Sequence, residues 1–215
     1  MSIFNKSKDK YEQYIWRKRL FLAELFILVV GLTVWSLCTG SSGMKIPDVF
    51  AALLHRGTKQ METIIWNVRM PRTATAIAVG AALALTGCVM QNVLRNPLAS
   101  ASTLGVSQGA SFGAAFAIIV LNMGTVGALG NMAIPVCAFV GSMGVALVIL
   151  ALSRIRQINA QGIVLAGTAI SAMFSGATTL MQYFANEIEL TTLVFWTYGS
   201  LSSTDWGDVG VMAVI

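Results

Sequence analysis

Residues 20–38 read LFLAELFILVVGLTVWSLC, an apolar run of 19 residues with a single charged side chain, Glu24. At about 1.5 Å of rise per residue, a helix of this length crosses a hydrocarbon core of ~30 Å. The preceding segment, residues 1–19, is polar and carries six of the chain's 14 lysines and arginines. An apolar helix with a basic flank is typical of a retained first transmembrane span whose flank stays in the cytoplasm.

The composition of the whole chain supports a membrane protein. Hydrophobic residues make up 56% of the 215 residues, charged residues 11%, and the mean hydropathy is +0.74. Soluble domains average about 25% charged residues, so this chain has too few to cover a water-facing surface. The net charge is +5, but the basic residues concentrate near the N-terminus instead of on one folded face. This pattern does not predict a nucleic-acid partner.

Four further apolar segments predict membrane spans, at about 73–91, 103–121, 132–152 and 162–185. Residues 207–215 begin a sixth span, although nine residues are too few to cross a membrane as a helix. We therefore expect an all-α polytopic membrane protein with about five full spans and the start of a sixth. We also expect residues 20–215 to be the N-terminal portion of a longer membrane domain.

The segment 39–72 is the longest early loop in this interpretation, and it contains one predicted short amphipathic helix. Pro47 suits the first turn of that helix. Its apolar face is formed by Ile46, Val49, Phe50, Leu53 and Leu54.

The charge distribution predicts the orientation. If the spans alternate, the N-terminus and the loops at 92–102 and 153–161 lie inside with nine basic residues, against five in the 39–72 loop outside. The positive-inside rule then places the N-terminus in the cytoplasm.

Small residues recur within the predicted spans. Such residues let helix backbones approach closely, and a pore lined by small side chains is the alternative interpretation. The candidates for helix packing are Gly80, Gly87, Gly105, Gly109 and Gly113.

The sequence shows no catalytic or metal-binding constellation. It has no phosphate-binding loop, no zinc-protease motif and no nucleophile elbow, so any ATP would be bound by another subunit. Cys38, Cys88 and Cys137 lie in or beside apolar runs without metal-ligand spacing, and His55 is the only histidine. We predict no enzyme activity, no metal and no cofactor.

Two arginines are unusual in their predicted place outside the membrane. Arg69 and Arg72, in the sequence RMPR, are three residues apart and so share a helix face. Both anchoring to lipid phosphates and docking of an acidic partner fit this position.

An ordered series of motifs resembles the FecCD family of permeases. After RMPR come GAALALTG at 80–87, QNVLRNPLA at 91–99, LGVSQGA at 104–110, LAG at 165–167 and FWTYGSL at 195–201. The resemblance covers about residues 45–207, and the order of the motifs makes it specific. One departure is Ala101, where the family usually has proline.

This resemblance implies the permease of an ABC importer for ferric siderophores, haem or cobalamin in a bacterial inner membrane. Such a permease has ten helices and dimerises with a second permease subunit, as a homodimer or a heterodimer. Two ATPase subunits bind on the cytoplasmic side, and an extracytoplasmic substrate-binding protein docks on the other. In the family, the arginines of the RMPR motif meet glutamates of the binding protein, which assigns docking to Arg69 and Arg72. Ferric siderophore is the expected cargo.

Four polar residues are candidates for the translocation pathway, because polar side chains in a membrane usually face protein or water. They are Gln91, Ser107, Gln108 and Gln182. Each fits an interhelical hydrogen bond equally well. An ion-coupled secondary transporter is the alternative class, but the acidic mid-membrane residues that it uses are absent from spans two to five.

Overall fold

The computed structural model describes residues 2–40, 43–123, 127–155, 158–202 and 204–214, and its secondary structure over these residues is helical, without strands. Among the described residues, four helices are long and apolar enough to cross a membrane. These are Tyr11–Cys38, Lys59–Val93, Met132–Ser153 and Ala160–Phe184. The all-helical fold is therefore confirmed. The chain divides into two compact units, Met1–Ala78 with Leu201–Ile215 and Val79–Ser200, here called unit 1 and unit 2.

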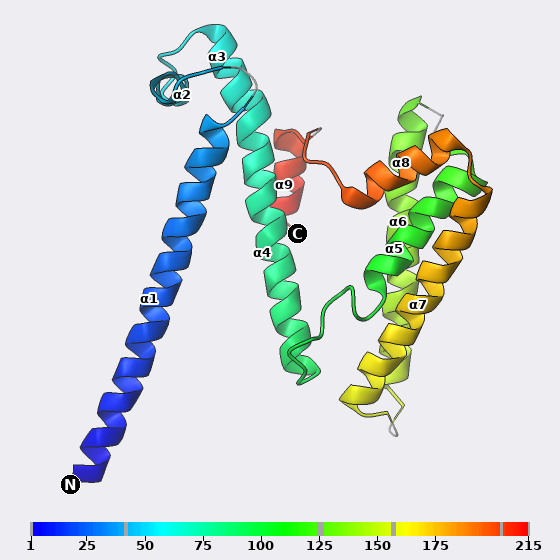
Figure 1. Cartoon of the computed structure of the whole chain (residues 1–215), viewed down its shortest axis with the longest axis horizontal. Helices are drawn as coiled ribbons and strands as arrows, with labels where there is room; N and C mark the ends of the chain where they lie inside the picture. The colour runs from blue at the N-terminus through cyan, green and yellow to red at the C-terminus, as the bar shows by residue number, and fades with distance from the viewer. Residues whose placement is uncertain (1, 41–42, 124–126, 156–157, 203, 215) are drawn as a thin grey trace. The chain divides into compact units, whose positions relative to one another are not determined.

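Unit 1 begins with the long helix α1, Ser2–Cys38, the blue helix of Figure 1. It contains the predicted span 20–38 and continues it through the basic N-terminal segment. The short helix α2, Ile46–Leu53, matches the predicted amphipathic helix. It starts where the Lys45 backbone N–H donates to Asp48 Oδ2 at 3.1 Å, and it buries Val49 and Ala52.

The prediction of a loop up to residue 72 is wrong in its second half. Helix α3, Lys59–Ile64, begins at Thr58, whose hydroxyl accepts from the Met61 backbone N–H. It continues through a π-helical turn, η1, Ile65–Arg69, into α4, Met70–Val93. Proline has no N–H and clashes with the preceding turn of an α-helix, so Pro71 favours a helix start over a place inside a continuous helix. The wider π-turn just before Pro71 lets the helix pass through it.

Unit 2 contains α5, Val106–Ala115, with its π-helical end η2, Phe116–Val120. It also contains α6, Gly127–Ser153, and α7, Ala160–Phe184, and the three lie side by side in Figure 1. The predicted span 103–121 corresponds to Val106–Val120, 15 residues. At about 22 Å this is shorter than a bilayer core. Residues 100–103 instead form a turn in which Ser100 and Thr103 exchange backbone-to-hydroxyl bonds.

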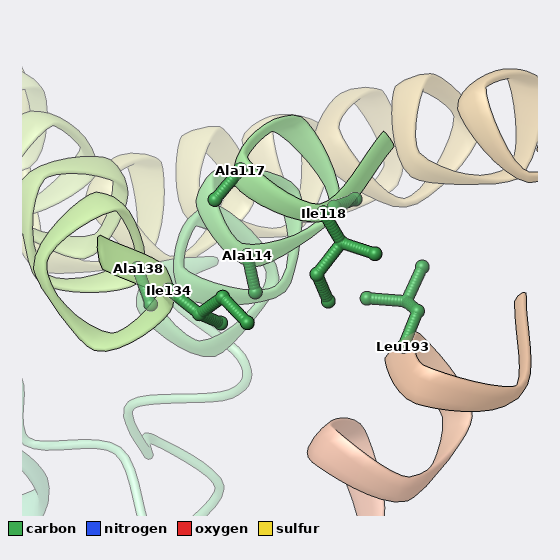
Figure 2. Close-up of a cluster of buried hydrophobic side chains, with 7 residues drawn as sticks. Ala114, Ala117, Ile118, Ile134, Ala138 and Leu193 are labelled. Atoms are coloured by element: carbon green, nitrogen blue, oxygen red, sulfur yellow. The ribbon is translucent and has the colours of Figure 1, made fainter. Parts of the chain in front are cut away.

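The core of unit 2 is small and built mainly from alanine and isoleucine. Figure 2 shows these side chains converging from α5, η2, α6 and α8. The cluster consists of Ala114, Ala115, Ala117, Ile118, Ile134, Ala138 and Leu193. Alanines at the contacts let the backbones come close, as expected of helices that pack without a hydrophobic driving force from water.

Helix α8, Glu187–Tyr198, lies in a segment that we expected to be a loop between spans five and six. Asn186 and Glu189 form a reciprocal capping box at its start, with bonds of 2.9 and 3.0 Å. Leu193 on this helix is fully buried in the unit 2 core. In unit 1, α9, Trp206–Val214, corresponds to the predicted start of a sixth span.

Candidate docking site

The predicted docking arginines lie in unit 1, next to a small apolar cluster. Leu37 from the last turn of α1, Val49 and Ala52 from α2, and Ile65 from η1 form the buried part of that cluster. It fixes the end of α1 against the start of the α3–η1–α4 helix. Arg69 is the last residue of η1 and Arg72 lies in the first turn of α4.

Arg69 contacts the carboxyl-terminal end of α1. Its Nη1 donates a hydrogen bond to the carbonyl oxygen of Leu37. The last carbonyls of a helix lack helical donors and carry the negative end of the helix dipole, so a guanidinium there is favourable. Beside it, the hydroxyls of Ser36 and Thr73 lie 3.4 Å apart and add a second polar contact between α1 and α4.

Arg72 contacts the segment that precedes α9. Its Nη2 donates to the Ser202 carbonyl oxygen at 2.8 Å, while its Nε is buried without a hydrogen-bond partner. Both arginines line one polar pocket of about 420 Å³, and both residues are half-buried. The pocket is lined by Ser36, Thr39, Gly40, Ile64, Val68, Arg69, Arg72 and Thr73.

Pro71 explains a second hydrogen bond, between η1 and the start of α9. In an α-helix the Met70 N–H would donate to the Trp66 carbonyl, but in the π-turn it donates to Ile65. The next donor along the chain would be Pro71, which has no N–H. The Trp66 carbonyl instead accepts from Trp206 Nε1 at 2.8 Å. The structure therefore gives Trp206 a specific hydrogen-bonding role in unit 1.

His55 has aromatic and acidic neighbours that the sequence did not reveal. Its ring stacks on Trp66 with centroids 5.1 Å apart, and its Nδ1 lies 3.7 Å from Glu62 Oε2. Trp66 Nε1 in turn donates to the Ala52 carbonyl at 3.3 Å. Within the part of the chain that the structure describes, no group of three metal-ligating side chains occurs.

The four pathway candidates all lie in unit 2, on three helices. Gln91 is exposed near the end of α4, and Ser107 is exposed in the first turn of α5. Gln108 Nε2 donates to Ser102 Oγ at 3.5 Å, while its Oε1 is buried without a partner. Gln182 is half-buried in the last turn of α7. The pathway role of these residues remains a prediction.

Three of the five candidate packing glycines lie at close helix contacts in unit 2. Gly105 has φ +83°, and a Cβ there would meet Ser171 N on α7 at 3.0 Å. A Cβ on Gly109 would meet the Gly141 carbonyl oxygen on α6 at 2.8 Å, and one on Gly113 would overlap the Cys137 carbonyl. At Gly80 and Gly87, no described atom outside the local helix lies within 4 Å of an added Cβ.

The sequence profile of the FecCD transport family matches residues 27–215. The chain belongs to the FecCD transport family. The match includes both arginines and every pathway and packing candidate, and confirms the resemblance read from the motifs. The part of α1 before residue 27 lies outside it.

Individual relatives agree with this assignment. A protein named as an ABC transporter permease in Methanocaldococcus jannaschii is 38% identical over 213 residues, which are 96% of this chain and 61% of the relative. The vitamin B12 import system permease protein BtuC of Citrobacter koseri is 34% identical over 195 residues, 91% of this chain and 56% of the relative. The chain thus spans between half and two thirds of the length of these relatives.

A solved structure shares the fold. It is described as an inward-facing conformation of a metal-chelate type ABC transporter, and it superposes with a TM-score of 0.71 at 28% sequence identity. The superposition covers 91% of this chain and 58% of the other. The fold of this chain is therefore one that also occurs in a metal-chelate type ABC transporter.

Proposed function

We propose that this chain is part of the permease subunit of an ATP-driven ABC importer in a bacterial cell membrane. The FecCD match over residues 27–215 carries the proposal, and the four helices able to cross a membrane support it. The permease pairs with a second permease subunit, two ATPase subunits and an extracytoplasmic substrate-binding protein. ATP hydrolysis on the partner subunits drives alternating access, and the permease supplies the pathway, with Gln91, Ser107, Gln108 and Gln182 as lining candidates.

The proposed cargo is a metal chelate, with ferric siderophore as the first candidate. Cobalamin is the second, because a relative at 34% identity is a vitamin B12 import permease. Uptake of radiolabelled ferric siderophore and of cobalamin, each into cells lacking the permease gene and into complemented cells, distinguishes the two. If neither compound shows uptake that depends on this permease, the proposed cargo class is wrong.

In the proposed orientation the N-terminus is cytoplasmic and Lys59 faces outward. Lys59 begins α3 and is exposed, and Arg154 is exposed in the turn after α6. With Cys38, Cys88 and Cys137 replaced, an impermeant thiol reagent applied to intact cells should label Lys59→Cys and spare Arg154→Cys. The reverse labelling would overturn the orientation.

The docking role of Arg69 and Arg72 follows from this orientation. Two half-buried arginines line one polar pocket, which suits carboxylates of a partner protein. Rim and interface charges of this kind set the association rate and its salt dependence, and losing one partner of a desolvated pair costs about 2–5 kcal/mol.

Charge reversal tests the docking role. Arg69→Glu with Arg72→Glu should abolish productive docking and uptake while membrane insertion and ATPase assembly persist. Changing the facing glutamates of the binding protein to arginine should restore part of the uptake. Unchanged uptake in the double variant would identify the arginines as lipid anchors.

A further inference from the structure

Gly40 lies in the turn two residues after the end of α1, and the guanidinium of Arg69 occupies the space where a side chain on Gly40 would be. A Cβ built on Gly40 would overlap Arg69 Nη2 and would meet Cζ at 2.8 Å and Nε at 3.2 Å. The φ angle of Gly40 is not in the left-handed region, so its backbone does not itself require glycine. The requirement comes from the guanidinium.

The acceptor on the other side of this contact is fixed by packing. Leu37, whose carbonyl accepts from Arg69 Nη1, is only 8% exposed and belongs to the apolar cluster with Val49, Ala52 and Ile65. The guanidinium therefore lies between a buried acceptor and a residue without a side chain. This arrangement holds it at the wall of the polar pocket.

We propose that Gly40 and the carbonyl end of α1 position Arg69 for docking of the substrate-binding protein. This inference rests on the proposed docking role of Arg69 and Arg72. Pairing of a guanidinium with a carboxylate through two parallel N–H bonds depends on the plane of the guanidinium, which a point charge would not need. A guanidinium held in place before binding also loses less conformational entropy when the partner arrives.

Substitution of Gly40 separates the orientation of Arg69 from its charge. In Gly40→Ala the new Cβ meets the far end of a flexible side chain, so the guanidinium moves and the fold is kept. Gly31→Ala is the matched control, because Gly31 also belongs to the α1 region and an added Cβ there has no described atom within 4 Å. Arg69→Gln removes the charge and the orientation together.

The test uses the full permease in nanodiscs and its purified binding protein, the one encoded with it, in surface plasmon resonance over a range of salt concentrations. Gly40→Ala should weaken binding by about tenfold, less than the loss expected from removing an interfacial charge, and keep the wild-type salt dependence of the association rate. Gly31→Ala should bind like the wild type, and Arg69→Gln should lose affinity and part of the salt dependence. Phenylglyoxal should modify the Arg69 guanidinium faster in Gly40→Ala than in the wild type, because this guanidinium is no longer held in place.

The outcomes separate this inference from the docking proposal. Wild-type affinity in Gly40→Ala with weakened binding in Arg69→Gln overturns the positioning role and leaves docking intact. Wild-type affinity in both Arg69→Gln and Arg72→Gln overturns docking itself, and the positioning role with it. A fall in thermal stability for Gly40→Ala that exceeds the fall for Arg69→Gln, which also removes the bond to Leu37, would assign Gly40 to the fold and also overturn the positioning role.

Discussion

Each of the two units is stabilised internally by a different kind of contact. In unit 2, α5 and α6 meet backbone to backbone, at Gly109 against Gly141 and at Gly113 against Cys137. In unit 1, side chains reach across to backbone carbonyls, from Arg69 to Leu37, from Arg72 to Ser202 and from Trp206 to Trp66. A backbone contact cannot yield to an added atom, whereas a side chain can move. We therefore expect substitutions in unit 2 to affect folding and those around the unit 1 arginines to affect binding.

The largest stability effect is expected at the α5–α6 contact. Gly113→Ala places a Cβ against the Cys137 carbonyl and within 3.0 Å of Ala138 Cα, so the helices must separate. Overpacking of this kind costs about 1–3 kcal/mol. Thermal unfolding in detergent, followed by fluorescence-detected size exclusion, measures the loss.

Gly144→Ala on α6 is the control for this prediction, because an added Cβ there has no described atom within 4 Å outside its own helix. Alanine favours a helix over glycine by about 1 kcal/mol, so the control should be neutral or slightly stabilised. Equal melting temperatures for both variants would show that the close approach does not limit stability, and would remove the contrast between the units.

A smaller effect is expected in unit 1 from Trp206→Phe. This change keeps an aromatic ring but removes the indole N–H that satisfies the Trp66 carbonyl, for which Pro71 supplies no donor. Because Trp206 is 44% exposed, water can replace part of the bond, and the loss should be about 1 kcal/mol or less.

The same melting assay tests this change, with Trp66→Phe for comparison, since it removes the bond from Trp66 Nε1 to the Ala52 carbonyl and reduces the ring that stacks on His55, but keeps the Trp66 carbonyl as the acceptor for Trp206. A loss for Trp206→Phe greater than that for Gly113→Ala would reverse the contrast between the units.

Much of the fold was readable from local sequence. Long apolar runs predicted the spans within α1, α4, α6 and α7, and the spacing of apolar residues after Pro47 predicted α2. Helix α8 was missed, although Asn186 followed three residues later by Glu189 is a capping-box signal. Thr58 before α3 gave a weaker signal of the same kind. Both helices are short, and they lie between long apolar spans, so their segments were interpreted as loops.

The candidate site also has features that the sequence predicted and features that it did not. The motif around Arg69 and Arg72 singled out these residues, and glycine spacing indicated the contacts at Gly105, Gly109 and Gly113. Nothing in the sequence marked Gly40, Gly141, Ser202 or the Trp206 hydrogen bond, because each is defined by a neighbour distant along the chain.

By itself the sequence determined the helical class, the apolar spans, the family motifs and the two arginines, because hydrophobic length and local residue order set these features. The tertiary structure alone decided which carbonyl each arginine contacts, which glycines lie at backbone contacts, and that a π-turn carries the helix through Pro71. Those features depend on which carbonyl or which backbone segment lies opposite a given residue. That juxtaposition arises only when segments far apart in the chain pack together.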